Sequence, residues 1–399
     1  MIPRGAWHQL GYQSAATARD VFPKSGGGGV GAILSPKDEG WSGCQSDAAQ
    51  FRRHGKSVMW DPQFFRLDFQ NGYSADYLTN PYRVSLHRNG GLAVTDQSGL
   101  ARALEITNRD LQTAAVIAPA VCVEASNSRS MDINELLFML AKQAGDALGI
   151  PTLASIPIAA SASASEAEIH TIIRRVTSWN AGGWYLLYDF DGNAVPSEFT
   201  RLQLWARTCL DLAATGKPLI LGYQGLLSVV SVGLGAHGIA LGQFQTLWHF
   251  DPNHWAGTTP GPIRRASTKF FSVPLWHPLR FPDDFPTLPS PQADPFLTPS
   301  PWSQIPQARQ VAARWGDADA RRHFMYTTTQ WIDAAMALPT PRERAIHAKE
   351  HLDQAMAHWV TLSRLRYQTP HSLPHAEWSA LLGWALTNRA QDYDWLDLL

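Results

Sequence analysis

Three carboxylates occupy positions from which they could perform acid-base chemistry. Asp61, Glu124 and Asp189 each lie at or just after the end of a short apolar stretch that predicts a buried β-strand. Two carboxylates that face one substrate can act as acid and base, or as nucleophile and acid, when their surroundings push their pKa values apart. This is the pattern of glycosidic-bond chemistry, in which the separation of the pair decides the stereochemistry. We therefore predict Asp61, Glu124 and Asp189 as catalytic residues.

The same positions also have a structural interpretation. Asp61 precedes Pro62, and an Asp-Pro pair commonly sets a turn. Asp191 and Gly192, which follow Asp189, form an ordinary turn dipeptide. Both interpretations stay open at the level of the sequence.

Uncharged polar residues follow the same apolar stretches and could hold a substrate. Such side chains can orient a substrate hydroxyl or the edge of a base at the mouth of a barrel. The predicted substrate-binding residues are Gln63, Tyr188, Tyr223, Gln224 and Gln243.

A cation site is the alternative chemistry. His249, Asp251 and His254 lie within the segment WHFDPNHW and carry atoms that ligate metals. Their spacing matches no established helix-borne or finger pattern, and histidines among aromatic residues are more often buried hydrogen-bonding groups. We therefore expect no metal and no cofactor.

The elements that must position these residues alternate along the chain. Short apolar strands are followed by helices that stop at a glycine. Because eight such units are what a barrel requires, we predict an α/β fold, a (β/α)8 TIM-like barrel. The runner-up is a doubly wound open sheet, which ordinarily has a glycine-rich fingerprint after its first strand that is absent here. The expected strands are 30–35, 57–60, 114–123, 152–158, 184–190, 218–222, 238–242 and 270–275.

Composition changes divide the rest of the chain. We expect an N-terminal extension over 1–29 and a barrel over 30–280, with an aromatic insertion at about 62–98 that is either a lid over the substrate or an additional layer. A Pro-rich connection over 281–306 then leads to a C-terminal helical subdomain over 307–399. The helices of this subdomain are a candidate surface for a protein partner.

The overall charge and hydropathy exclude several classes of protein. Lys and Arg total 33 and Asp and Glu total 34, so no net basic field favours non-specific nucleic-acid binding. No apolar run approaches the roughly 20 residues that cross a bilayer, and the N-terminus lacks the apolar segment of a secretory signal. The three cysteines are scattered, as in a reducing compartment. We expect a soluble cytoplasmic protein with a small-molecule or nucleic-acid-derived substrate and no membrane contact.

A glycine-rich run carries a family resemblance. The segment GYQGLLSVVSVGLGAHGIALG, residues 222–242, resembles the sixth and seventh strands of phosphate-binding TIM barrels, including flavin-dependent ones. It is also similar to the corresponding part of the tRNA-guanine transglycosylase family, in which paired aspartates carry a base exchange at a glycosidic bond. The resemblance touches Gly222, Gly235, Gly238 and Gly242, and it implies phosphate binding at the last three. The chain lacks the Cys and His zinc cluster of the transglycosylases.

These observations give three functional hypotheses. The first is a TIM-barrel hydrolase or transferase that acts on a glycosidic or nucleoside-like bond with carboxylate acid and base residues. The alternative is a non-catalytic binding or assembly module for a protein or nucleic-acid partner. The third is a flavin-dependent oxidoreductase, which rests on the glycine turn alone.

Overall fold

The computed structural model describes most of the chain. It describes residues 1–11, 14–24, 28–65, 86–88, 92–94, 97–255, 268–281, 283–285, 291–310, 315–365 and 373–388. The aromatic insertion expected at about 62–98 lies largely outside these described residues.

The described elements alternate as the sequence predicts. The strands are β1 (Gly5–Gln9), β2 (Gly31–Leu34), β3 (Ser57–Trp60), β4 (Leu86–Arg88), β5 (Leu92–Val94), β6 (Val116–Ile117), β7 (Thr152–Ile158), β8 (Gly183–Tyr188), β9 (Leu219–Leu221), β10 (Gly238–Leu241), β11 (Lys269–Ser272) and β12 (His277–Arg280). The α-helices are α1 (Ser14–Val21), α2 (Pro36–Arg53), α3 (Gln97–Leu111), α4 (Arg129–Leu148), α5 (Ala160–Ser163), α6 (Glu166–Thr177), α7 (Phe199–Ala213), α8 (Ser228–Ser231), α9 (Gln304–Gln307), α10 (Asp317–Met336), α11 (Pro341–Arg364) and α12 (His375–Asn388). Short 3₁₀ helices include η4 (Gln245–Leu247) and η5 (Pro252–Trp255).

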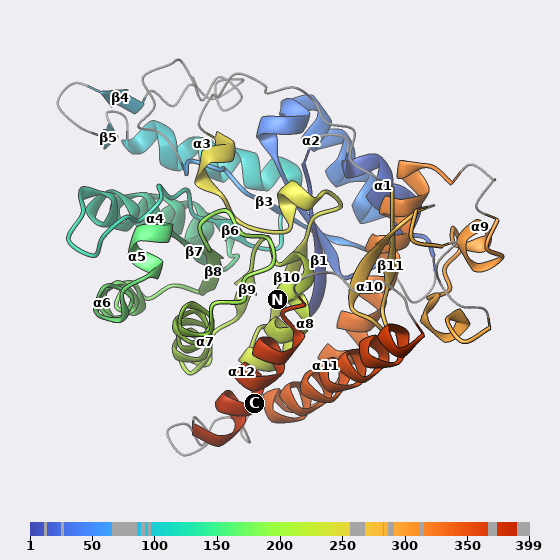
Figure 1. The fold of residues 1–399 in the computed structure, drawn as a ribbon. Helices are drawn as coiled ribbons and strands as arrows, with labels where there is room; N and C mark the ends of the chain where they lie inside the picture. Colours follow the sequence, from blue (N-terminus) through green and yellow to red (C-terminus); the bar gives the residue numbers. More distant parts are fainter. Residues whose placement is uncertain are drawn as a thin grey trace.

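The strands form a nearly closed parallel barrel with helices around it (Figure 1). In the part of the chain that the structure describes, eight strands pair in the order β3-β2-β1-β10-β9-β8-β7-β6. The two end strands of this sheet, β3 and β6, approach each other. The N–H of Ala114, two residues before β6, donates to the carbonyl of Val58 on β3 at 2.8 Å. The fold is therefore the predicted α/β class, a (β/α)8 barrel with C-terminal helices.

The assignment of the first and eighth strands from the sequence was wrong. The first barrel strand is β1, within the stretch expected to be an N-terminal extension, and it pairs with both β2 and β10. The stretch 270–275 instead contributes to β11, which pairs with β12 in a two-stranded antiparallel ribbon outside the barrel sheet. The first strand was not predicted because it contains the polar residues His8 and Gln9, which are nevertheless fully buried in the structure. The Nε2 atom of His8 lies 3.1 Å from the carbonyl oxygen of Gly28.

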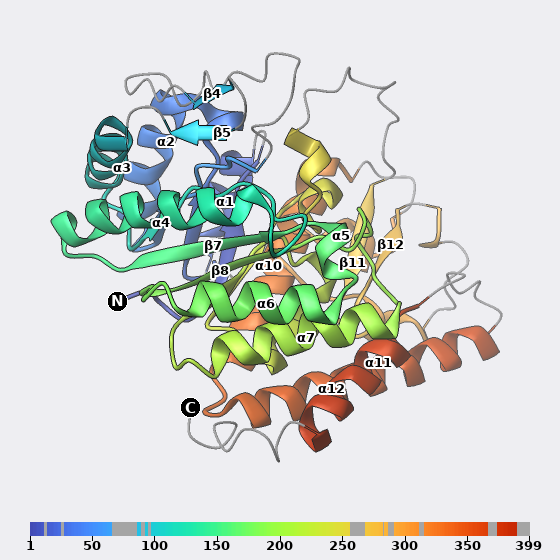
Figure 2. The same ribbon diagram turned by 90° about the vertical axis from the view of Figure 1, so that its left-hand side faces the viewer.

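The predicted C-terminal helices are confirmed, and they pack directly on the barrel. Helix α10 contacts β1 and α1, and Asp333 on this helix accepts the N–H of Ala6 at 2.8 Å. Helix α10 thus takes the place of the eighth barrel helix. Helices α11 and α12 form a further layer beside α7 (Figure 2). Among the described residues, no helix combines the length and the apolar character that a membrane crossing requires.

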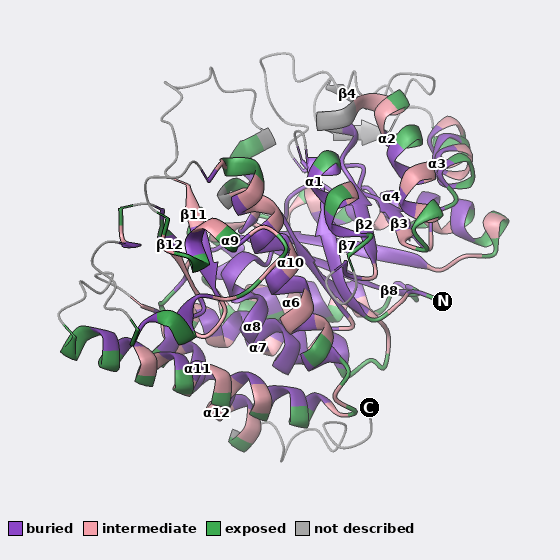
Figure 3. Ribbon diagram, turned by 90° about the vertical axis from the view of Figure 1, so that its right-hand side faces the viewer, coloured by how far each residue is buried: buried purple, intermediate pink, exposed green. Residues whose placement is uncertain are grey.

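The strands bury both of their faces. Along β8, Tyr185 and Leu187 belong to the cluster inside the barrel, whereas Trp184, Leu186 and Tyr188 belong to the layer between strands and helices. Figure 3 shows the central strands buried and the exposed residues gathered on the outer faces of the helices. Side-chain parity along each strand therefore decides which residues can face the barrel interior.

Candidate active site at the barrel mouth

A buried polar network lies inside the C-terminal end of the barrel, with Asp61 at its centre. The loop after β3 carries Asp61, whose side chain is only 1% exposed. Its Oδ2 atom lies 3.1 Å from the hydroxyl of Tyr185 on β8, and its Oδ1 atom accepts the N–H of Gln63 at 3.0 Å. The same Tyr185 hydroxyl lies 2.9 Å from Oε1 of Gln9, at the end of β1. Residues from three different parts of the barrel therefore meet at the Tyr185 hydroxyl.

A glycine makes room for this network. A Cβ atom on Gly222, just after β9, would lie 2.2 Å from Cδ2 of Leu187 and 3.0 Å from the Tyr185 hydroxyl. The contact with Leu187 is closer than packed atoms allow, and the contact with Tyr185 is tight. The absence of a side chain at Gly222 thus fits the packing of Leu187 and Tyr185 inside the barrel.

The protonation of the network follows from its hydrogen count. Burial raises the pKa of Tyr185 well above its usual value, so the hydroxyl keeps its single proton. That proton cannot be donated to both Gln9 Oε1 and Asp61 Oδ2. The network is satisfied when Asp61 is protonated and donates to Tyr185, which then donates to Gln9. When Asp61 is ionised, the Tyr185 hydroxyl donates to Asp61, and a flipped Gln9 amide can donate from its Nε2 to the Tyr185 oxygen. In the unflipped orientation this Nε2 is buried without a partner among the described residues.

The surroundings of Asp61 favour its neutral form. Burial raises the pKa of Asp61 to about 7, against the opposing effect of the hydrogen bonds from the Gln63 backbone and the Tyr185 hydroxyl. A carboxyl group with this pKa is available both as an acid and as a base near neutral pH. Near neutral pH, Asp61 therefore occurs in both protonation states.

Further polar side chains extend the network across the mouth. Gln63 Oε1 accepts the hydroxyl of Ser35 at 2.8 Å, and Gln63 Nε2 donates to the hydroxyl of Tyr223 at 3.3 Å. Gln63 and Tyr223 both have a φ of +57°, a left-handed conformation that non-glycine residues rarely adopt. Phe250 packs against Tyr223 and Phe65, with ring centroids 5.9 and 5.1 Å apart, and covers this end of the barrel interior.

Asp189 lies at the end of β8, in surroundings that differ from those of Asp61. Its Oδ1 atom accepts the N–H of Gly192 at 2.9 Å, within a tight turn in which Asp191 has a φ of +63°. Burial raises the pKa of Asp189; the hydrogen bond from Gly192 lowers it, and the charge of Asp251 raises it further. Asp189 thus stabilises a turn and also has a raised pKa.

The structure separates the remaining predicted residues from the network. Glu124 is exposed, and its backbone carbonyl accepts the hydroxyl of Ser161. Tyr188 points to the helix side of β8 and donates to the carbonyl of Ser163 at 3.0 Å, because it alternates with the inward-facing Asp189. The amide of Gln224 bonds locally, to the carbonyl of Gly222 and the hydroxyl of Ser231. These contacts support structural roles.

The predicted phosphate-binding glycines do not meet at one end of the barrel. Gly238 begins β10 and Gly242 follows its end, so about 13 Å of strand separates them at roughly 3.3 Å per residue. Gly235 precedes the strand and has a φ of +79°, which ends a 3₁₀ helix. Gly242 allows η4 to pack closely, because a Cβ atom there would lie 2.0 Å from Cβ of Leu247. Their geometry is explained by packing and turn formation.

Gln243 lines a cavity beside the mouth. The cavity has a volume of about 130 Å³ and lies between the end of β10, the β11-β12 ribbon and the start of α10. Gln243 is 4% exposed, and neither polar atom of its amide has a hydrogen-bond partner among the described residues. The other lining residues are largely aromatic or charged, and they include Phe244, Trp248, Phe271, Phe324, Lys269 and Arg321.

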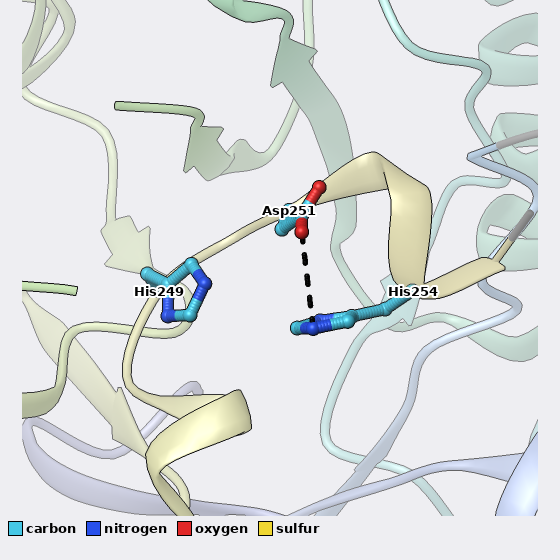
Figure 4. Close-up of side chains that lie close together, drawn as sticks. All are labelled: His249, Asp251 and His254. Carbon is cyan, nitrogen blue, oxygen red and sulfur yellow. Dashed lines mark ion pairs between the residues drawn. The ribbon is translucent and has the colours of Figure 1, made fainter. Parts of the chain in front are cut away.

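A group of potential metal ligands lies on the segment that covers the mouth. His249, Asp251 and His254 turn their side chains toward a common space (Figure 4). The potential ligand atoms all lie within 4.8 Å of one another, and His254 Nε2 is 3.8 Å from Asp251 Oδ2. The sequence analysis named these three residues as an alternative cation site but matched their spacing to no established pattern, because the turn at Pro252, rather than a regular helix, brings them together.

Comparison of the sequence with protein-family models and with curated proteins gives no match. The (β/α)8 barrel is thus the class that the fold defines. The resemblances to transglycosylases and to flavin-dependent barrels gain no support from these comparisons.

Sequence reasoning also missed three residues of the network, Gln9, Ser35 and Tyr185. Gln9 lies in β1, within the stretch that the sequence predicts as an N-terminal extension. This one short strand gives little sequence signal for a barrel strand. Tyr185 could have been found, because it lies four residues before Asp189 on the same strand and therefore faces the same side.

Proposed function

We propose that this barrel is a hydrolase or transferase that acts on a glycosidic or nucleoside-like bond through carboxylate acid-base catalysis. The observation that carries the proposal is the buried Asp61 carboxyl group, held by Tyr185 and Gln63 at the C-terminal end of the barrel with a pKa of about 7. Working residues of barrel enzymes gather at this end. Perturbed carboxyl groups in such positions are typical of catalytic sites.

The two carboxylates have different environments, as acid-base pairs require. Asp61 lies deep in the hydrogen-bonded network and is the proposed general acid. Asp189 lies at the end of β8 in a turn and is the proposed base or nucleophile. Because Asp61 is 1% exposed, substrate contact requires side chains around it to be displaced.

The cavity at Gln243 is the proposed binding site for the rest of the substrate. Its aromatic side chains suit a planar ring, and the buried Gln243 amide can both donate to and accept from a base or a sugar hydroxyl. Lys269 and Arg321, together with Asp317 of opposite charge, give the lining a net positive charge that favours an anionic group on the substrate.

The experiment is a pH-rate profile of the full chain with p-nitrophenyl glycosides and ribonucleosides as substrates. We expect release of nitrophenol or free base with a limb near pH 7, and a roughly 10²- to 10⁴-fold lower kcat for Asp61→Asn. The matched control is Asp283→Asn, which removes an exposed carboxylate elsewhere. No release from any substrate, or an unchanged kcat and profile in Asp61→Asn, would overturn the proposal.

A further inference from the structure

The segment that covers the barrel mouth presents a set of side chains with the composition of a metal centre. His249 precedes the buried Phe250, Asp251 follows it, and His254 lies one turn later in η5. Two imidazoles and one carboxylate form a ligand set that zinc and other divalent transition metals accept, with at least one coordination position left open. This set is independent of the acid-base network around Asp61.

The geometry allows a single ion to be bound by all three side chains. Donor atoms of a tetrahedral zinc site lie about 3.4 Å apart, given metal-ligand distances of about 2.0 to 2.2 Å. Here the potential donor atoms lie within 4.8 Å of one another, and His254 Nε2 and Asp251 Oδ2 are 3.8 Å apart. Small side-chain rotations would close the remaining difference. The two imidazole centroids are 5.6 Å apart, and the planes differ by 59°, so the rings do not stack.

The carboxylate is already fixed for this role by the turn that contains it. Asp251 Oδ1 accepts the N–H of Asn253 at 2.9 Å, which leaves Oδ2 facing His254. Ligating carboxylates are typically oriented by such second hydrogen bonds. The side chains of Asp251 and His254 are 18% and 35% exposed, so an ion can reach them from solvent.

The position of the group connects it with the barrel mouth. Asp251 Oδ2 lies 3.8 Å from the position that a Cβ atom on Gly192 would occupy, and the Gly192 N–H donates to Asp189. An ion at this place would lie beside the turn that follows β8. Its open coordination position could then bind a water molecule or an oxygen atom of a substrate.

We propose that His249, Asp251 and His254 form a binding site for a divalent transition-metal ion of the zinc class, at the mouth of the barrel. The site requires no activity of Asp61, and it is tested by metal binding alone. Failure of this test would leave the proposed acid-base function standing, and the reverse also holds.

The experiment is calorimetric titration of the full chain with ZnCl₂ after removal of bound metal by a chelator. We expect saturable binding of one equivalent and a higher Tm in the presence of the ion. His254→Ala and Asp251→Asn should each lower the affinity of this equivalent at least about 10- to 100-fold. Asn at position 251 retains an oxygen for the Asn253 N–H, so this variant preserves the turn.

The matched control is His170→Ala, which removes an exposed histidine from α6 on the outside of the barrel and should leave zinc binding unchanged. Cobalt titration provides a second readout, because its visible absorption changes with coordination by nitrogen and oxygen ligands. Absence of saturable binding would show that Asp251 and His254 form only an ion pair and would overturn the proposal. Equal affinities in wild type, His254→Ala and Asp251→Asn would do the same.

Discussion

Replacement of Asp61 by Asn tests the buried carboxyl group through the pH dependence of stability. The folded protein holds Asp61 with a pKa of about 7, compared with an ordinary value of 3.8. In that interval the folded state binds a proton that the unfolded state has released. The free energy of unfolding therefore falls as pH rises from about 4 to about 7.

The size of this effect follows from the two pKa values. At 1.36 kcal/mol per pH unit, the full difference corresponds to about 4 kcal/mol, which is present as a destabilisation above pH 7 and absent below pH 3.8. Between pH 5 and pH 8 the contribution of Asp61 changes by about 3 kcal/mol. Because Asn does not ionise, the Asp61→Asn variant should lack this change.

The assay is urea unfolding of both proteins at pH 5, 6, 7 and 8, followed by tryptophan fluorescence. We expect the difference in unfolding free energy to shift by about 3 kcal/mol in favour of Asp61→Asn between pH 5 and pH 8. Contributions of other titrating groups cancel in this difference, and Asp283→Asn, an exposed carboxylate, serves as the control. Parallel stability profiles of wild type and Asp61→Asn would refute the raised pKa and with it the acid-base assignment.

Three further substitutions test the remaining contacts. Tyr185→Phe removes a hydrogen bond that lowers the pKa of Asp61, so the pH-dependent fall in stability should extend to higher pH, with an overall loss of about 1 to 3 kcal/mol in urea unfolding. Asp189→Asn keeps an oxygen for the Gly192 N–H, so it should abolish turnover with a nearly unchanged Tm; a large fall in Tm would assign Asp189 to the turn alone. Gly222→Ala should cost about 1 to 3 kcal/mol by overpacking in the same unfolding assay, whereas Gly316→Ala, which meets no atom within 4 Å, should not.

The sequence was sufficient to predict most of the barrel because its strands and helices follow a simple rhythm. Seven of the expected strands overlap strands of the barrel, since an apolar stretch, a helix and a closing glycine recur in each unit. The prediction of the first strand failed because the residue pattern shows which side chains are polar but does not show which of them have buried hydrogen-bond partners. His8 and Gln9 appear polar in the sequence, yet they are buried by contacts with segments that lie far away in the chain or on other strands.

The sequence predicted those features of the candidate site that depend on neighbouring residues in the chain. The position of Asp61 after β3 follows from the strand that precedes it, but its burial depends on Tyr185 and Gln9 from distant strands. Tyr188 was assigned to the mouth although strand alternation places it on the opposite side from Asp189. Convergence across a barrel is a property of the closed sheet, which no window of sequence contains.

The energetics of the barrel mouth support the proposed catalytic function over a non-catalytic module. Asp61 destabilises the folded state by about 4 kcal/mol once ionised, as derived above from its pKa. Gln63 and Tyr223, which contact each other, both hold left-handed backbone conformations that cost about 1 to 2 kcal/mol each. Asn at position 61 would remove the cost of ionisation with little change in side-chain shape. The proposed acid-base function requires a titratable group in a fixed position, which supports it over a module that only binds a partner through its outer helices.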